Sequence, residues 1–406
     1  MRNYNPKQFS PILGVALVLV LCSNTPQVRA GNHVIAWGAG TVIADPPDQN
    51  DYGQSSVPAN ITNAVYVAGG WRHSLVVNAD GTIQGWGDDT FGQQDFSANT
   101  DGYLTVAAGL LHSLALSAAG LVETAGDDTY GQIDVPTNLA NVVAISCGFY
   151  HSLALRTNGT VVAWGAGLTN APADYFDFGQ SIVPTNLSGV VAVAGGGYYS
   201  LALKADGTLQ AWGDNTYGQT SIPAGLSNVV AIAAGAAYGL ALKGDGTLAA
   251  WGDNTYGQTS IPAGLSNVVA IASGGWHGMA LKSIGTVVAW GAGVGTNAYV
   301  DCNQTTVPNG LTNVAQISGG AVNSLALVGA APPVKGAFLS GATLGTNGFR
   351  VSLPARSGHV YRLEYKTALT NSNWTALPLV AGRAGTLELS DQTAAGEARY
   401  YRVRRW

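Results

Sequence analysis

The sequence predicts an all-β protein, a seven-bladed β-propeller that is closed by its N-terminal strand and followed by a small C-terminal β-sandwich. Three observations support this fold class: a tandem repeat with a period of about 40 residues, short apolar segments separated by glycine-rich turns, and first and last repeats that are each incomplete. Units of this kind bury their apolar faces only against neighbouring copies, so a series of them builds one continuous architecture.

The repeat is clearest at 212–250, which reads WGDNTYGQTSIPAGLSNVVAIAAGAAYGLALKGDGTLAA, and the copy at 251–289 keeps its first 22 residues unchanged. Apolar composition predicts strands at 228–233, 238–243 and 247–251, and a weak fourth strand at 258–262 that is stopped by proline. Gly-Asp-Gly at 244–246 has hairpin-turn chemistry. Each unit is therefore expected to be a small antiparallel sheet, and radially packed blades suit such sheets better than a helical solenoid.

Two markers count the copies. The dipeptide Trp-Gly begins at Trp37, Trp86, Trp164, Trp212, Trp251 and Trp290, with a degenerate copy at Ala125, and the second-strand motif HSLAL or a variant begins at 73, 112, 151, 199, 238, 277 and 323. The chain starts with a Trp-Gly strand at 33–38, and its last unit lacks one. We therefore expect 33–38 to pair with 323–328 and close the ring, which removes two exposed strand edges.

The repeats occupy 31–328, and other segments flank them. Residues 1–30 combine Arg2 and Lys7 with an apolar run at 12–22 and the cleavage pattern Val28-Arg29-Ala30, which predicts a secretory signal peptide; an uncleaved membrane anchor is the alternative. We expect a secreted, extracytoplasmic or cell-surface protein with no membrane span after cleavage. A Pro/Gly linker at 329–336 precedes the module at 337–406, where alternating patterns predict strands at 349–353, 359–366, 385–390 and 398–405.

Composition excludes several classes. Only 10% of residues are charged and 55 are glycine, which argues against disorder. Residues 31–332 carry five Lys/Arg against nineteen Asp/Glu, a net charge of −14, whereas 333–406 carry ten against four, a net charge of +6. An acidic propeller is a poor nucleic-acid binder, because phosphates require a basic surface.

Cys147 and Cys302, the two cysteines beyond the signal segment, fall in distant units, so no disulfide is expected. We expect a monomer.

No catalytic or cofactor motif is present, so the sequence predicts neither an enzyme nor a cofactor or metal site. Histidines at 73, 112, 151 and 277 share one repeat position, where we interpret them as hydrogen-bonding between blades; a metal-binding ring is the alternative. The Asp-Asn-Thr-Tyr-Gly-Gln stretches are interpreted as turns. Two alternatives rest on the acidic inserts: bound calcium, which would use Asp45, Asp48, Asp51, Asp174 or Asp177, and a carbohydrate-active enzyme that would use Asp174 or Asp177.

The strongest functional signal is a variable turn. With the strands of a unit named a to d, the a–b and c–d turns lie on one face and the b–c hairpin and d–a link on the other. The two residues at each a–b tip vary between copies: Trp71-Arg72, Leu110-Leu111, Phe149-Tyr150, Gly197-Tyr198, Ala236-Ala237, Gly275-Trp276 and Ala321-Val322.

Three c–d turns, after Trp37, Trp164 and Trp290, carry acidic inserts on this same face. We therefore predict a face that binds a protein or glycan through Trp71, Arg72, Phe149, Tyr150, Tyr198 and Trp276. The alternative is that these aromatic side chains only plug the central channel.

The pattern GG-x-x-HSLAL-x-x-DGT-VVAWG-DNTYGQ, carried by seven copies over 33–328, resembles the repeat of the regulator-of-chromosome-condensation (RCC1) type, a seven-bladed propeller. Its Gln-x-x-x-Pro ending and its spacing of 39 residues between Trp212 and Trp251 are most similar to the secreted bacterial propeller that inhibits β-lactamases. The resemblance implies the fold, and it permits a bacterial inhibitor of an extracellular enzyme such as a β-lactamase as an alternative function. It implies no target, because the residues at the turn tips decide that.

Overall fold

The computed structural model describes residues 32–40, 51–168, 176–293, 301–329, 340–345, 348–368, 370–371, 373–383, 385–394 and 399–406. The predicted signal peptide, most of the predicted linker, and Asp45, Asp48 and Asp174 lie outside the described residues. Within the described ranges the regular elements are strands, and none of these ranges holds a helix long and apolar enough to cross a membrane.

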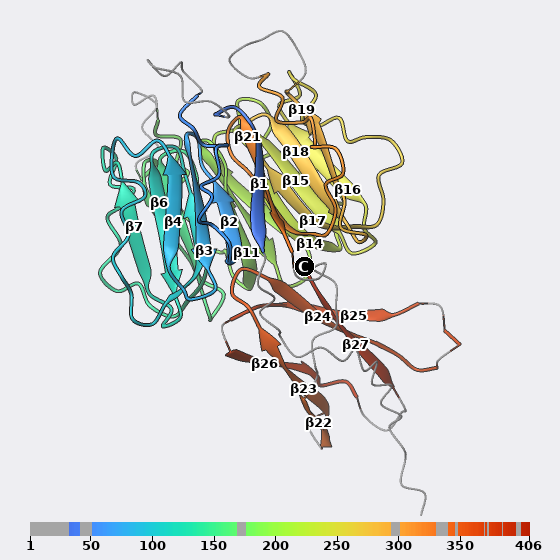
Figure 1. Ribbon diagram of the computed structural model, residues 1–406. Helices are drawn as coiled ribbons and strands as arrows, with labels where there is room; N and C mark the ends of the chain where they lie inside the picture. The colour runs from blue at the N-terminus through green and yellow to red at the C-terminus, as the bar shows by residue number, and fades with distance from the viewer. Residues whose placement is uncertain are drawn as a thin grey trace, which may run out of the picture.

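Residues 33–328 form seven three-stranded antiparallel sheets, and each sheet is one blade (Figure 1). The inner strands are β2 (Ala64–Gly69), β5 (Tyr103–Ala108), β8 (Val142–Cys147), β11 (Val190–Gly195), β14 (Val229–Ala234), β17 (Val268–Ser273) and β20 (Val314–Gly319). The middle strands are β3 (His73–Asn78), β6 (His112–Ser117), β9 (His151–Arg156), β12 (Tyr199–Lys204), β15 (Tyr238–Lys243), β18 (His277–Lys282) and β21 (Asn323–Val328). The outer strands are β4 (Ile83–Gly87), β7 (Val122–Gly126), β10 (Val161–Gly165), β13 (Leu209–Gly213), β16 (Leu248–Gly252), β19 (Val287–Gly291) and β1 (His33–Gly38).

Six blades follow the chain order, and the seventh combines both ends of the repeat region. There β1 pairs with β21, with His33 opposite Val328 and Gly38 opposite Asn323, which is the pairing that the sequence predicts. The inner strand of each blade contacts the next one, and β20 contacts β2.

A chain of backbone hydrogen bonds follows the same circuit through the a–b turns: Trp71 N to Gly109 O, Leu110 N to Phe149 O, Phe149 N to Gly197 O, Gly197 N to Ala236 O, Ala236 N to Gly275 O, Gly275 N to Ala321 O, and Ala321 N to Gly70 O.

The predicted fourth strand is wrong. Residues 258–262 are turn and irregular structure, and the blades of the described chain have three strands. The reason is the buried Gln258, whose Oε1 accepts a hydrogen bond from Tyr256 N at 2.8 Å while its Nε2 donates to Asp253 at 2.7 Å. Its backbone carbonyl accepts from the Trp290 indole of the next blade at 3.0 Å. Side chains thus use the polar groups that a fourth strand would have needed.

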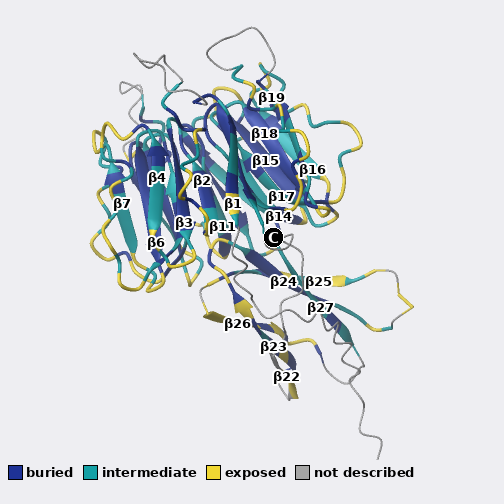
Figure 2. Ribbon diagram, viewed as in Figure 1, coloured by how far each residue is buried: buried dark blue, intermediate teal, exposed yellow. Residues whose placement is uncertain are grey.

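The middle strands supply the core, as β15 and β18 show by their mostly dark blue colour in Figure 2. Leu153 and Leu155 of β9, like the equivalent leucines of other middle strands, have no exposed surface, because both faces of the middle strand pack against neighbouring blades. Burial of each such leucine is worth about 1.5–3 kcal/mol. The tryptophan of the outer strand is also buried, and its indole typically donates to the glutamine carbonyl of the preceding blade, as Trp212 does to Gln180 at 2.9 Å.

The first residue of each middle strand links adjacent blades, so the predicted structural role of the histidines is confirmed. His73, His112, His151 and His277 each bond through Nε2 to a serine hydroxyl of the next blade: Ser113, Ser152, Ser200 and Ser324, at 2.8–3.1 Å. The junctions between blades 4 and 5 and between blades 5 and 6 lack that serine, because Gly239 and Gly278 replace it. There Tyr199 and Tyr238 donate instead to a main-chain carbonyl of the next blade. Asn323 donates to Ser74 at 3.4 Å at the remaining junction.

This alternation predicts a coupling that a double-mutant cycle can measure. Tyr199→His should destabilise the fold because the imidazole meets Gly239, which offers no hydroxyl. Gly239→Ser alone should also destabilise it, because the new Cβ would lie too close to the Trp251 indole and the new hydroxyl would have no imidazole to pair with. Together the two changes recreate the junction that His151 forms with Ser200, so we expect a favourable coupling of about 1 kcal/mol or more in the free energy of unfolding. If the losses of unfolding free energy, measured by urea denaturation, were simply additive, the proposed pairing of histidine with serine and of tyrosine with glycine would be wrong.

Residues 340–406 form a second body of two three-stranded sheets, which we call the C-terminal module. One sheet contains β22 (Ser340–Gly345), β23 (Gly348–Ala355) and β26 (Gly385–Asp391), and the other contains β24 (Val360–Lys366), β25 (Thr375–Ala381) and β27 (Tyr400–Arg405). The apolar side chains between them, including Phe349, Leu363 and Leu389, form their own core. Strands β22 and β25 were not predicted from the sequence.

The C-terminal module packs on the b–c face of the propeller (Figure 1). Hydrogen bonds between described residues join the two bodies, among them Gly358 N to Val143 O at 3.1 Å, Leu379 N to Ala205 O at 2.8 Å, Arg362 Nη1 to Asn228 Oδ1 at 2.9 Å, and Arg404 Nη1 to Gly244 O at 2.7 Å. Val360 and Leu379 also belong to the same apolar cluster as Val229 of the propeller. The module is therefore an integral part of the fold.

Candidate binding face

The strand registers place two kinds of turn on one face: the a–b turn, which joins the inner strand to the middle strand, and the c–d turn, which follows the outer strand. His73 pairs with Gly87 in blade 1, so the a–b turn before His73 and the c–d turn after Gly87 lie at the same end of the blade, and this repeats around the ring. The C-terminal module occupies the opposite end. We call the end that carries the a–b and c–d turns the aromatic face, because of the side chains that gather there.

Five of the six residues predicted as a site come together on this face. Trp71 lies between Trp276, at a ring-centroid distance of 5.4 Å, and Phe149, at 5.1 Å. Phe149 contacts Tyr198 edge-on at 5.7 Å, and Tyr198 stacks on Tyr150 at 6.1 Å. These turns come from blades 1, 3, 4 and 6, yet their rings form one connected row. Each of the five side chains is half-buried, so part of each ring remains accessible.

Three more rings extend the row, and the sequence did not single them out. Tyr130 contacts Tyr150 at 5.1 Å, Phe176 contacts Tyr150 at 4.8 Å, and Phe178 contacts Tyr198 at 5.4 Å. They belong to c–d turns, Tyr130 in the DDTYGQ stretch and the two phenylalanines in the insert after Trp164. We use the name aromatic cluster for these eight residues: Trp71, Tyr130, Phe149, Tyr150, Phe176, Phe178, Tyr198 and Trp276.

Arg72 lies in the predicted a–b turn, but its side chain does not join the row of rings. Its guanidinium lies over the ring of Tyr52, 4.5 Å from the centroid, and so pairs with the c–d turn of blade 7. A cation over an aromatic face is attracted by the ring quadrupole. Arg72 thus stands beside the aromatic cluster rather than inside the row of rings.

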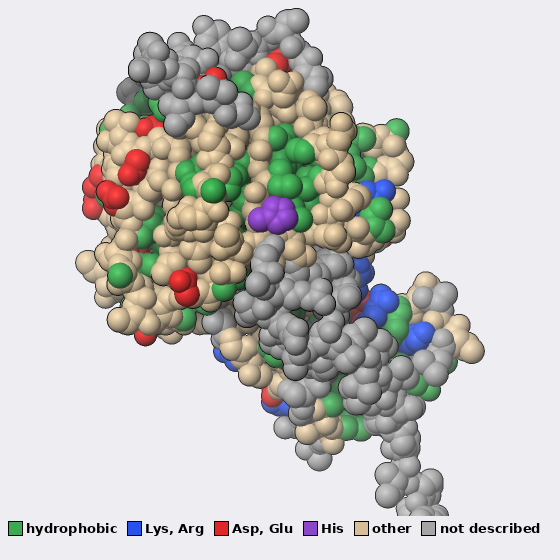
Figure 3. Space-filling model, in the orientation of Figure 1, with side chains coloured by type: hydrophobic (Ala, Val, Ile, Leu, Met, Phe, Trp, Pro, Cys, Tyr) green, Lys and Arg blue, Asp and Glu red, His purple; other side chains and the backbone are tan. Residues whose placement is uncertain are grey.

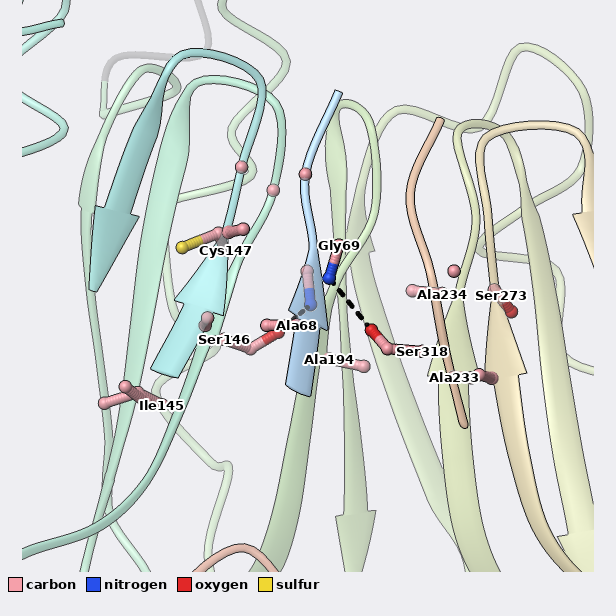
Figure 4. Close-up of a pocket in the computed structure, with 18 of the residues that line it drawn as sticks. Ala68, Gly69, Ile145, Ser146, Cys147, Ala194, Ala233, Ala234, Ser273 and Ser318 are labelled. Carbon is pink, nitrogen blue, oxygen red and sulfur yellow. Dashed lines mark hydrogen bonds between the residues drawn. The ribbon is translucent and has the colours of Figure 1, made fainter. Parts of the chain in front are cut away.

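The aromatic cluster also bears on the channel. A cavity of about 320 Å³ runs along the ring axis and is lined mainly by the small residues of the inner strands, among them Ser146, Cys147 and Ser318 (Figure 4). Serine hydroxyls there accept from inner-strand amides of adjacent blades, Ser318 from Gly69 N at 3.1 Å and Ser146 from Gly195 N at 3.0 Å.

Trp71 and Phe149 line one end of this cavity, and Gly358 and Gly382 of the C-terminal module line the other. Two aromatic residues therefore do help to plug the channel, while the other six residues of the aromatic cluster are not among those that line it.

The propeller is more acidic than the C-terminal module. In Figure 3 most of the acidic side chains in view lie on the propeller, and most of the basic ones lie on or beside the C-terminal module. Burial, the neighbouring Tyr150 and Tyr130, and the carboxylate of Asp214 raise the pKa of Tyr198 to about 12. Burial, Tyr130 and Asp127 raise the pKa of Tyr150. The phenols of Tyr150 and Tyr198 are therefore neutral at physiological pH.

The acidic turns show turn chemistry, as predicted. In blade 4 one oxygen of Asp214 accepts from Thr216 N at 2.9 Å and from its hydroxyl at 2.6 Å, and the other accepts from the Gln219 amide at 2.8 Å. The described residues include no cluster of three or more histidine, cysteine or acidic side chains that could hold a metal ion. Asp51 and Asp177, two of the insert carboxylates, bond to backbone amides at Gly40 and Gly179.

Four segments of the chain match a known repeat family. The family model "Regulator of chromosome condensation (RCC1) repeat" matches residues 64–93, 142–168, 190–219 and 229–258. No curated protein sequence matches the chain.

Two solved structures are similar. Human WBSCR16 is 19% identical, with a TM-score of 0.56, and the match covers 75% of this chain and 100% of that one. Prp20p from Saccharomyces cerevisiae is 18% identical, with a TM-score of 0.57, and the match covers 74% and 92%. At these identities the likeness concerns the fold, and together with the repeat matches it agrees with the strand pattern derived above. The chain is an RCC1-like repeat β-propeller.

Proposed function

We propose that this protein is an exported, non-enzymatic binding propeller that holds a protein partner through the aromatic cluster. The observation that carries the proposal is the gathering of eight half-buried aromatic rings, contributed by turns of separate blades, on the face that the C-terminal module leaves open. Tryptophan and tyrosine dominate the energetics of protein interfaces because they bury large areas at low entropic cost.

Two further points favour binding over catalysis. The histidines with strongly lowered pKa values, such as His277, are fully buried between blades and do not open onto the aromatic face. The similar yeast structure was described together with the binding of Prp20p to Gsp1p and histones, a binding activity. An RCC1-like propeller that works as a binding scaffold fits both points.

Affinity capture tests the proposal. The bait is the chain that begins at Asn32, used beside its Trp71→Ala/Trp276→Ala variant, with envelope and medium of the source organism as prey. Leu121→Ala/Ile284→Ala is the matched control, because these exposed apolar residues, at 55% and 71% exposure, lie on b–c hairpins at the opposite face. We expect a protein retained by the unchanged chain and the control and lost from the tryptophan variant, with a loss of about 2 kcal/mol or more for a true anchor.

Equal capture by all three baits would contradict the proposal. Melting curves of the variants check that the ring is intact. If the captured protein is an enzyme, activity assays with added propeller test inhibition, and a panel of β-lactamases and proteases covers the target class that the resemblance permits. Retention of a glycan instead of a protein would shift the assignment to carbohydrate binding.

A further inference from the structure

The turns of the aromatic face carry almost only negative charge, which the net charge of the whole chain does not reveal. Every c–d turn carries at least one aspartate, and the described ones are Asp51, Asp88, Asp89, Asp127, Asp128, Asp177, Asp214, Asp253 and Asp301. Arg72 is the sole Lys or Arg in the a–b and c–d turns. The other basic residues of the propeller end their b strands at the opposite face, where Lys204 and Lys243 pair with Asp206 and Asp245.

The aspartates that open the turns of three blades, Asp127, Asp214 and Asp253, accept hydrogen bonds from neutral side chains. Asp127 accepts from the Thr129 hydroxyl at 2.7 Å and from the Gln132 amide at 2.6 Å. Such bonds fix the carboxylate without cancelling its charge, so a field of negative potential surrounds the aromatic cluster. The effect reaches the rings themselves, since Asp127 and Asp214 contribute to the raised pKa values of Tyr150 and Tyr198.

A ring of carboxylates around exposed aromatic faces selects one kind of side chain. A lysine or arginine can lay its apolar stem along the rings, place its cation over a π face, and gain attraction from the nearby carboxylates. An acidic peptide or a polyanion meets repulsion at the same place. The chain uses this pairing elsewhere: Arg402 and Lys366 lie over Trp374, and Arg72 lies over Tyr52.

We propose that the partner is recognised through a lysine- or arginine-bearing segment that lies across the aromatic cluster within this acidic rim. The inference rests on the proposed function, and it adds the chemistry of the partner. Attraction between the negative turns and the positively charged segment would speed the encounter, and the aromatic rings would hold the bound segment.

Peptide binding tests the inference directly. The probes are two labelled peptides of equal length, one alternating lysine with serine and the other alternating glutamate with serine, followed by fluorescence anisotropy with the chain that begins at Asn32. We expect the lysine peptide to bind and the glutamate peptide to remain free. Binding should weaken as salt is raised, because exposed charges are screened.

The repeats themselves supply the variants. Asp89 and Asp128 occupy the position of Asn215 and Asn254, whose side chains accept the same backbone hydrogen bond, so Asp89→Asn/Asp128→Asn removes two charges and keeps the turn. Asp206→Asn/Asp245→Asn is the matched control on the opposite face, where Asn158 shows that asparagine fits. Tyr150→Leu/Tyr198→Leu keeps apolar bulk and removes two π faces.

For the lysine peptide we expect a loss of about five-fold with the first pair, about ten-fold with the tyrosine pair and under about two-fold with the control. Equal affinity for both peptides, or equal losses from both aspartate pairs, would overturn the inference. If affinity capture still finds a partner lost from the tryptophan variant, the proposed function stands without it.

Discussion

Removal of β1 should destabilise the whole propeller and should lower the melting temperature more than any single substitution. The strand adds the outer strand of blade 7, and its Trp37 is buried, with the indole donating to Gln304 O at 2.8 Å. Val34, also buried, joins a cluster with Trp86 and Val67 of blade 1, so the strand holds the two ends of the repeat region together. Loss of Trp37 alone, as Trp37→Ala, should cost about 3–5 kcal/mol.

The comparison is between chains that begin at Asn32 and at Ala39, both with the C-terminal module retained. Thermal unfolding followed by circular dichroism gives the melting temperatures. An unchanged melting temperature after the deletion would show that β1 does not close the ring.

Mild acid should unfold the protein, and the four blade-junction histidines should account for much of this effect. Burial lowers the pKa of His73, His151 and His277 to about 3 and that of His112 to about 4, below the ordinary value of 6.5. Between about pH 6.5 and these lowered values, the four imidazoles are therefore protonated in the unfolded chain and neutral in the folded chain. Their contribution to stability is complete above about pH 6.5 and is lost as the pH falls towards the folded values, at about 2 kcal/mol per imidazole between pH 7 and pH 5.

The tyrosine junctions provide the control. His277→Tyr/Ser324→Gly copies the junction between Tyr238 and Gly278, which has no group that titrates in this range. Urea unfolding measured at several pH values should show a shallower dependence for this variant than for the parent. The same slope in both proteins would mean that the imidazole of His277 is not the source of the acid sensitivity.

Local repetition explains which parts of the fold could be predicted from sequence. The middle and outer strands follow from periodic apolar runs, and the incomplete end units predict the pairing of β1 with β21. The weak fourth strand failed because a buried glutamine, such as Gln258, takes over the polar groups of that segment. Strand β22 is glycine-rich, and β25 contains Pro378 and mostly half-exposed or exposed positions, so neither carries the alternation that marks a strand.

The aromatic face could be predicted only in part. Variable a–b tips pointed to Trp71, Phe149, Tyr150, Tyr198 and Trp276, since a position that varies within an otherwise constant repeat is free of structural demands. Tyr130 was missed because it occupies the same repeat position as Tyr217, which is 59% exposed and outside the aromatic cluster.

Contact of the basic C-terminal module with the acidic propeller was one of several alternatives that the charge difference left open, and the residues that make the contact were not predicted. The pairing of Arg362 with Asn228 joins residues 134 positions apart, and no periodic pattern marks it.

Site-specific photo-crosslinking tests the central claim, that the aromatic face is where the partner binds. A photoreactive phenylalanine analogue placed at Trp276 should form a covalent adduct with the captured partner, and the same analogue at Ile284 on the opposite face should form none. Adducts from Ile284 and none from Trp276 would contradict this claim and place the partner on the face that carries the C-terminal module.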